Sequence, residues 1–169
     1  MPEKRTLERA RRDREAGKAP STQAGEFVRE EMEHIREAKH GARSSKQAIA
    51  IGLSKARRAG VDLPPPEEGT TSSRTRKSAA RDFARGNGAP AKRKSTAKRS
   101  RASTRALKRE GTSAASRQSL SKQARTAARR RTSNERSAAA RKAMQTKGPR
   151  ERSAAARKAA RTREQHTGT

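Results

Sequence analysis

The chain has 169 residues, of which 28% are hydrophobic and 37% charged, and its formal net charge is +28 at pH 7. It contains no Cys, which excludes disulfides, thiolate metal sites and thiol catalysis, and the lack of Trp and Tyr leaves almost no aromatic surface for stacking on bases. No apolar run approaches the roughly 20 residues that span a bilayer, and the first residues are charged rather than signal-like, so we expect no membrane association and a cytoplasmic location.

The charge is unevenly divided along the chain. Residues 70–169 hold thirty Lys and Arg against five acidic residues, whereas residues 1–69 hold fifteen against twelve. Low hydropathy with a high net charge is typical of disordered chains, because the burial of apolar surface cannot offset the loss of chain entropy. The composition therefore predicts a mostly disordered chain, with a short αα-hairpin at about residues 21–61 and a basic Ala- and Arg-rich tail that forms helices only transiently.

Residues 1–20 are predicted to be a basic N-terminal arm. Within it, residues 6–16 favour a short solvated helix with Leu7 as its one sizeable apolar side chain, so the helix should be marginal by itself. Gly17 and Pro20 are expected to end it.

Residues 21–63 are predicted to form the hairpin. In its first helix one arc is apolar, and the opposite face carries Glu26, Glu30, Glu33 and Glu37. The apolar arc consists of Phe27, Val28, Met32, Ile35 and Ala38. Gly41 is predicted to stop this helix as its C′ glycine.

The second helix of the hairpin is predicted to begin at a capping box formed by Ser44 and Gln47. Gly60 is the expected C′ glycine at its other end, followed by a Schellman contact of Val61. Its apolar arc includes small residues that would let the two helices approach closely, namely Ala48, Gly52 and Ala56. About 40 residues is near the lower limit of independent folding, so the hairpin is expected to need a partner, such as a second copy.

Residues 64–74 are predicted to be a Pro-rich linker, and residues 75–169 the disordered or part-helical basic tail. The segment ERSAAARKA occurs twice in the tail, at residues 135–143 and 151–159. Thr132 stands at capping-box spacing from Glu135, and Pro149 stands at the first helical position of the second copy. The repeats favour helices that form in part when free and are stabilised when phosphates neutralise their charge.

The tail is suited to neutralising phosphates, since Arg binds a phosphate through two parallel hydrogen bonds and Lys binds it as a point charge. From the tail we predict as phosphate contacts Arg129, Arg130, Arg131, Arg136, Arg141, Lys142, Arg157, Lys158 and Arg161. From the basic face of the second hairpin helix we add Lys55, Arg57 and Arg58.

The sequence contains no arrangement of residues that is typical of a catalytic site. His34, His40 and His166 show no metal-ligand spacing, and residues 86–88 (GNG) indicate a turn rather than a phosphate-binding loop. We expect no enzymatic activity, no metal, no cofactor and no small-molecule substrate.

The segment at residues 25–66 resembles a family of small uncharacterised bacterial proteins. The resemblance is carried by FVREEM at residues 27–32 and by KQAIAIGLSKARRAG at residues 46–60. It extends more loosely through residues 75–85 and 100–125. The resemblance implies a DNA-binding protein, since such proteins are often described in that way because of their charge. The tail is also similar in composition to the tails of bacterial histone-like proteins, although it is richer in Arg.

Three functions are compatible with these features. The first is a non-specific, nucleoid-associated DNA-binding protein that acts by phosphate neutralisation. The second is an RNA- or ribosome-associated stress factor, since Arg enrichment does not separate DNA from RNA. The third is a protein-interaction adaptor in which the hairpin docks a partner.

Overall fold

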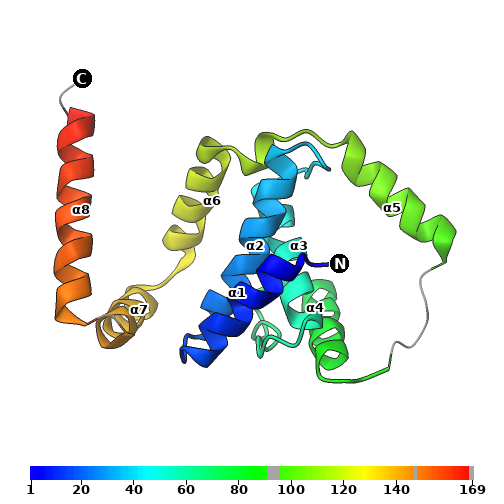
Figure 1. Cartoon of the computed structure of the whole chain (residues 1–169), viewed down its shortest axis with the longest axis horizontal. Helices are drawn as coiled ribbons and strands as arrows, with labels where there is room; N and C mark the ends of the chain where they lie inside the picture. The colour runs from blue at the N-terminus through cyan, green and yellow to red at the C-terminus, as the bar shows by residue number, and fades with distance from the viewer. Residues whose placement is uncertain (91–95, 147, 168–169) are drawn as a thin grey trace. The chain divides into compact units, whose positions relative to one another are not determined.

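The computed structural model describes residues 1–90, 96–146 and 148–167, with no side-chain description for residues 143, 146, 166 and 167. These ranges contain helices and no strand (Figure 1). The helices are α1 (Lys4–Glu15), α2 (Pro20–Arg36), α3 (Ser45–Arg58), α4 (Ser73–Gly86), α5 (Ala97–Arg109), the short 3-10 helix η1 (Ser113–Ala115), α6 (Arg117–Arg130), α7 (Ser133–Thr146) and α8 (Pro149–Thr167). None of them combines the length and the apolar character needed to cross a bilayer.

The prediction of a mostly disordered chain is wrong, because helices account for 74% of the residues that the structure describes. A small apolar fraction argues against a large core, but it does not argue against helix, and Ala, Arg and Lys are among the strongest helix formers. The tail also supplies N-cap hydroxyls: Ser72 accepts from the backbone N–H of Thr75, and Thr96 accepts from that of Arg99. Local propensity and capping therefore order segments whose composition resembles that of a disordered chain.

The chain divides into two compact units, residues 1–123 and residues 124–169, with the boundary inside α6. The first unit contains the hairpin and every buried hydrophobic side chain of the described residues. The second contains the end of α6 together with α7 and α8, whose described side chains are almost all exposed.

Helices α2 and α3 pack against each other as the predicted hairpin, and small residues allow the close approach. A Cβ on Gly52 would lie 2.7 Å from Val28 Cα, so this position tolerates no side chain without a shift of the helices. Phe27 and Ala56 are buried at one end of the hairpin together with Ala10 of α1. At the other end the apolar cluster consists of Met32, Ile35, Ala42, Ala48, Ala114 and Ala115.

Segments on both sides of the hairpin in the sequence cover its apolar ends. The N-terminal segment packs onto α2 through the buried residues Thr6 and Ala10. On the other side, Ser45 donates to the carbonyl of Ala114 (2.6 Å), and Arg36 donates to the carbonyl of Ala115 (3.2 Å). The chain itself therefore contributes much of the partner surface that the hairpin needs.

The ends of the two hairpin helices differ in how well the sequence predicted them. Gly60 adopts φ +85°, and Val61 N–H donates to the carbonyl of Ala56 (3.1 Å), which confirms the Schellman motif after α3. The predicted stop at Gly41 is wrong, because α2 ends at Arg36 and the left-handed position is taken by Ala38, with φ 56°.

Gly41 has a different role in the loop between α2 and α3. Its N–H donates to the carbonyl of Leu107 (2.9 Å), and a Cβ at this position would overlap the carbonyl group of Glu110. The end of α5 therefore docks on the loop through close backbone contact. Gly86 plays a similar part where α4 crosses α3, since a Cβ there would overlap the carbonyl oxygen of Arg57.

Candidate nucleic-acid interface

Helix α4 separates its apolar and basic residues onto different faces. Ala79 is buried, and Asp82 accepts a hydrogen bond from Ser54 of α3 (2.5 Å). The exposed cations follow one another at intervals of three or four residues and therefore form a stripe along the helix: Arg74, Lys77, Arg81 and Arg85.

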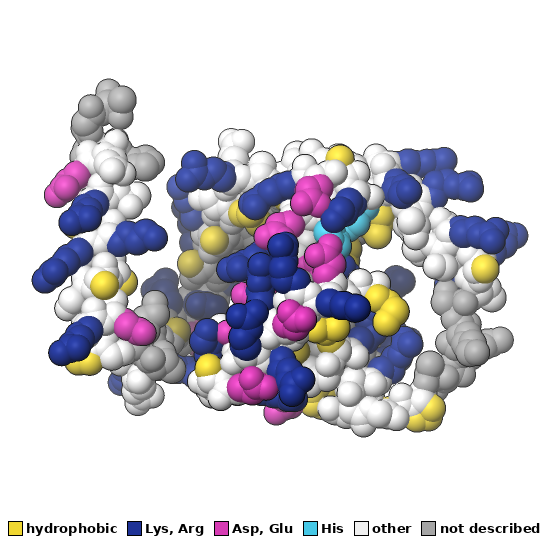
Figure 2. Space-filling model, viewed as in Figure 1, with side chains coloured by type: hydrophobic (Ala, Val, Ile, Leu, Met, Phe, Trp, Pro, Cys, Tyr) yellow, Lys and Arg dark blue, Asp and Glu magenta, His cyan; other side chains and the backbone are white. Residues whose placement is uncertain are grey.

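Helix α5 carries a second stripe, formed by the exposed residues Lys98, Arg101, Arg105 and Lys108. The ten residue-to-residue steps from Lys98 to Lys108 span about 15 Å at the rise of an α-helix. Figure 2 shows this region as a group of Lys and Arg side chains, whereas acidic side chains gather over α1 and α2. The sequence prediction missed these cations, although their spacing is visible in the sequence once a helix is assumed.

Helix α6 has a shorter stripe, in which Lys122, Arg125 and Arg129 are exposed at the same spacing. Stripes of cations on one helix face thus recur on α4, α5 and α6. The predicted phosphate contacts included residues of α6 but none of α4 or α5.

The nine tail residues that the sequence predicted as phosphate contacts are all exposed. Arg129 and Arg130 end α6, Arg131 follows it, and the others lie on the two repeat helices. On α7 these are Arg136, Arg141 and Lys142, and on α8 they are Arg157, Lys158 and Arg161. They point in several directions around their helices rather than along one face, since pairs such as Arg157 and Lys158 are adjacent in sequence.

The capping box predicted before the first repeat is present. Glu135 N–H donates to Thr132 Oγ1 (3.2 Å), and Thr132 N–H donates to Glu135 Oε2 (2.6 Å). The bond from the Thr132 backbone also holds the pKa of Glu135 below its ordinary value. Pro149 is the first residue of α8, as its position before the second repeat predicts.

The three predicted contacts on α3 are engaged within the first unit. Arg57 is 8% exposed and donates to the carbonyls of Leu63 (3.0 Å) and Pro64 (3.3 Å), and its burial lowers its pKa. Arg58 lies 3.7 Å from the carboxylate of Asp82. The Lys55 ammonium is close to two buried carboxylates of α2, at 3.2 Å from Glu30 and 2.7 Å from Glu31. Lys55 and Arg57 are therefore engaged in stabilising the fold, whereas Arg58 stays exposed beside Asp82.

The acidic face of α2 is paired with basic residues of the N-terminal helix. Glu26 lies 3.6 Å from Arg9 and 3.5 Å from Arg29, and Glu33 lies 3.9 Å from Arg5. Glu26 and Glu33 are thus paired with cations of the first 69 residues, while the cations of α4 to α8 have few acids near them in sequence.

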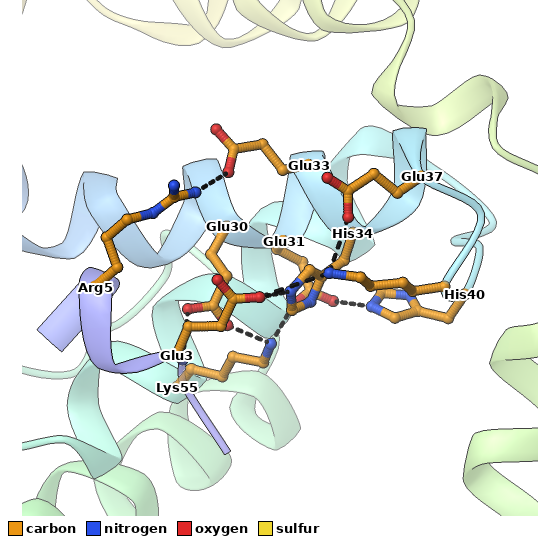
Figure 3. Close-up of polar contacts among 10 residues, drawn as sticks. Glu3, Arg5, Glu30, Glu31, Glu33, His34, Glu37, His40 and Lys55 are labelled. Carbon is orange, nitrogen blue, oxygen red and sulfur yellow. Dashed lines mark hydrogen bonds and ion pairs between the residues drawn. The ribbon is translucent and has the colours of Figure 1, made fainter.

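Lys55 belongs to a polar cluster between α1, α2 and α3, which we define as Glu3, Glu30, Glu31, His34, His40 and Lys55 (Figure 3). Glu3 Oε1 lies 2.9 Å from His34 Nε2, and this hydrogen bond is the main cause of the lowered pKa of Glu3. Burial raises the pKa of Glu30, but hydrogen bonds from Thr6, the Glu3 backbone and Lys55 outweigh it, and the net shift is downward.

One part of this polar cluster has the composition of a metal-ligand set. Glu31, His34 and His40 each offer a ligand atom, and these atoms lie within 4.8 Å of one another. The sequence did not predict this grouping, because His40 lies beyond the end of α2 and only the turn at Ala38 brings it back. The side chain of His166 lies outside the described ones.

Residues 20–67 match a family described as a family of unknown function (DUF6496). The matched segment starts with α2, includes α3 and ends just after the triple proline, so it coincides with the hairpin that the sequence predicts. No curated protein matches the chain, and no solved structure matches it.

Proposed function

We propose that this protein binds DNA without sequence preference, and that its exposed helix-borne cations neutralise phosphates of the duplex. The observation that carries the proposal is the net charge of +25 on residues 70–169, together with the exposure of their cations in stripes on α4, α5 and α6. A nucleoid-associated role would follow from such binding.

The stripes suit a phosphate backbone better than scattered charges would. Four cations along about 15 Å of α5 present a regular row, and an α-helix fits the major groove of B-form DNA, which is about 12 Å wide. Because the helices are already formed, binding does not have to repay the entropy of folding them.

Base-specific recognition has little support in the side chains. Phe27 is buried at 1% exposure and Phe83 is half-buried, so neither offers an open platform for stacking on bases. Phosphate contacts position a protein on the duplex but carry no sequence information, which supports binding without preference.

The test uses the full chain, a short duplex DNA with a fluorescent label, and salt concentrations between about 50 and 300 mM. Each phosphate contact adds about 0.9 to the steepness of the decline of log K with log salt. Changing Lys98, Arg101, Arg105 and Lys108 together to Gln should therefore make the slope shallower by up to about 3.6. Gln is a good helix former, so α5 should persist in the variant.

The matched control removes four exposed cations from the N-terminal helix α1, by changing Lys4, Arg11, Arg12 and Arg14 to Gln. It lowers the net charge equally but leaves the stripes intact, so its slope should stay close to that of the parent chain. If the two variants changed the salt slope equally, binding would depend on net charge and not on the arrangement of the cations in stripes. A parent chain that ignores DNA at the lowest salt would refute the proposed function itself.

Competition with structured RNA at matched salt decides between the two nucleic acids. A-form RNA has a deep and narrow major groove that does not admit a helix, so stripes that work through the groove should prefer duplex DNA. Tighter binding of RNA would instead favour an RNA-associated role.

A further inference from the structure

We propose that Glu31, His34 and His40, with Glu3 as the fourth ligand, form a binding site for Zn²⁺ that ties the start of α1 to α2 and to the loop after it. The proposal concerns the polar cluster alone and is independent of nucleic-acid binding.

The fold brings the side chains together from three places. Glu31 and His34 are three residues apart on α2 and therefore share a face of the helix. Beyond the end of α2, Lys39 N–H donates to the carbonyl of His34 (3.0 Å), and Ala38 adopts the left-handed conformation with φ 56°. This turn directs the chain back, and the rings of His34 and His40 meet edge to face with their centroids 6.0 Å apart (Figure 3).

The left-handed conformation costs a residue with a Cβ roughly 1–2 kcal/mol, and strained residues of this kind concentrate at functional sites. Here the strained residue is the one that returns His40 to the cluster.

The hydrogen bonds of His40 leave a nitrogen directed at a carboxylate. His40 Nδ1 lies 3.1 Å from the carbonyl oxygen of Gly41, and because a carbonyl only accepts, Nδ1 must carry the hydrogen. In the neutral ring Nε2 then holds a lone pair, and it lies 3.2 Å from Glu31 Oε1. Two lone pairs facing each other at this distance require a cation between them or a proton on one of the two groups.

A metal ion satisfies this arrangement more fully than a proton does. A metal-binding His almost always donates its other N–H to a carbonyl or carboxylate, which is the bond that His40 makes to Gly41. A proton on His40 would satisfy the pair of His40 and Glu31 alone, whereas a metal ion would also engage His34. Glu31 is 1% exposed, and its Oε2 makes no hydrogen bond, although the Lys55 ammonium lies 2.7 Å away and neutralises part of its charge.

The distances suit a small tetrahedral ion. Bonds of about 2.0–2.1 Å place neighbouring ligands of Zn²⁺ roughly 3.3 Å apart. The pair His40 Nε2 and Glu31 Oε1 is separated by 3.2 Å, and the pair His34 Nε2 and Glu3 Oε1 by 2.9 Å. Within the set of Glu31, His34 and His40, the two other separations (Glu31 to His34, and His34 to His40) are at most 4.8 Å, and Glu3 lies outside this set, so a tetrahedral site needs side-chain movements of about 1 Å or more.

The donor set also selects the kind of ion. Two imidazoles with carboxylates suit Zn²⁺ and its late first-row neighbours, whereas Mg²⁺ and Ca²⁺ prefer oxygen ligands throughout. With neutral histidines, the carboxylates of Glu3, Glu30, Glu31 and Glu37 face the two ammonium groups of Lys39 and Lys55, which leaves two net negative charges for a divalent cation to neutralise.

The test titrates Zn²⁺ into the full untagged chain, after removal of metal with a chelator, in competition with a chromophoric zinc indicator and without nucleic acid. We expect one ion per chain at micromolar or lower concentration, and a visible Co²⁺ spectrum of the tetrahedral type when Co²⁺ replaces Zn²⁺. At a hundredfold excess over the dissociation constant, Zn²⁺ should raise the melting temperature by roughly 5–10 °C.

Three histidine variants give the matched comparison. His34→Gln and His40→Gln should each weaken Zn²⁺ binding at least tenfold, while His166→Gln removes the remaining histidine of the chain and should change nothing. Glu3→Gln, at a half-exposed position, should weaken binding by about tenfold if Glu3 is the fourth ligand. His40 lies in a loop, so its variant should fold even if a change at buried Glu31 does not, and circular dichroism without metal checks this.

The proposal is overturned if the parent chain takes up no Zn²⁺ at 100 µM, or if binding survives in both His34→Gln and His40→Gln. It is equally overturned if His40→Gln lowers the melting temperature while Zn²⁺ leaves that of the parent chain unchanged. That result would identify the contact of His40 with Glu31 as an imidazolium and carboxylate pair.

Discussion

Replacing Gly52 by Ala should destabilise the hairpin relative to the same replacement at Gly25, although both changes improve helix propensity by about 1 kcal/mol. Gly25 lies in α2 with nothing within 4 Å of the position that a Cβ would take. Gly52 lies in α3, where a Cβ would stand 2.7 Å from Val28 Cα, 3.0 Å from its backbone nitrogen and 3.0 Å from its Cγ2. The two variants therefore share the propensity term and differ in packing.

The packing term can be worked out from these contacts. Carbon atoms are comfortable at about 3.5–4.0 Å, so α2 and α3 must separate locally by close to 1 Å to admit the methyl group. Overpacking of this kind costs about 1–3 kcal/mol. Gly25→Ala should raise the free energy of unfolding of the first unit by about 1 kcal/mol. The free energy of unfolding of the Gly52→Ala variant should be about 1–3 kcal/mol lower than that of the Gly25→Ala variant.

The assay must report on the hairpin rather than on the exposed helices of the second unit. Hydrogen exchange of peptides from α2 and α3, followed by mass spectrometry, gives the opening free energy of the hairpin, and urea unfolding followed by circular dichroism gives a second value. Adding Val28→Ala to the Gly52→Ala variant should restore little of the lost stability, because two of the three close contacts are with backbone atoms of Val28. Equal stability of the two single variants, within about 0.5 kcal/mol, would refute the close approach of the helices.

Three further changes probe the ends of helices and the polar cluster. Ala38→Gly should raise the free energy of unfolding by about 1 kcal/mol, because Gly adopts the left-handed conformation without strain, and urea unfolding measures this. The lowered pKa of Glu30 means that its contribution to stability is complete above its ordinary pKa of 4.5 and is lost as the pH falls through the lower folded value. Unfolding between pH 6 and pH 3 should therefore show a loss of stability that Glu30→Gln reduces, at a cost on the order of 2 kcal/mol at neutral pH. An unchanged pH profile in that variant would contradict the assignment. Thr132→Ala should destabilise α7 by about 1 kcal/mol, seen as faster amide exchange in its first turn, whereas Thr162→Ala, within α8, should leave that exchange unaltered.

Features that depend on neighbours in sequence were predictable. The two hairpin helices, the Ser44 cap and the Gly60 Schellman motif are present as predicted. So is the capping box of Thr132 and Glu135. Each of these relies on contacts within about five residues, and the periodicity of the sequence records such contacts directly.

The order of the tail was not predictable from its composition. Mean hydropathy measures how much apolar surface a chain can bury, but the segments after the hairpin dock through few side chains. Ala79, Ala114 and Ala115 fill small spaces, while Gly41 and Gly86 allow backbone to meet backbone. Such contacts leave no hydrophobic pattern in the sequence, so a segment that uses them has the composition of a solvated one.

The sequence by itself determined the helical hairpin, the caps of its second helix and the concentration of positive charge after residue 69, because each follows from residue type and local spacing. The tertiary structure decided which charges are available. It turns Lys55 and Arg57 inward, pairs the acids of α2 with the cations of α1, and brings His40 to Glu31 and His34. The physical reason is that a charge is neutralised by whatever lies within a few ångströms of it in space, and only the folded chain sets those distances.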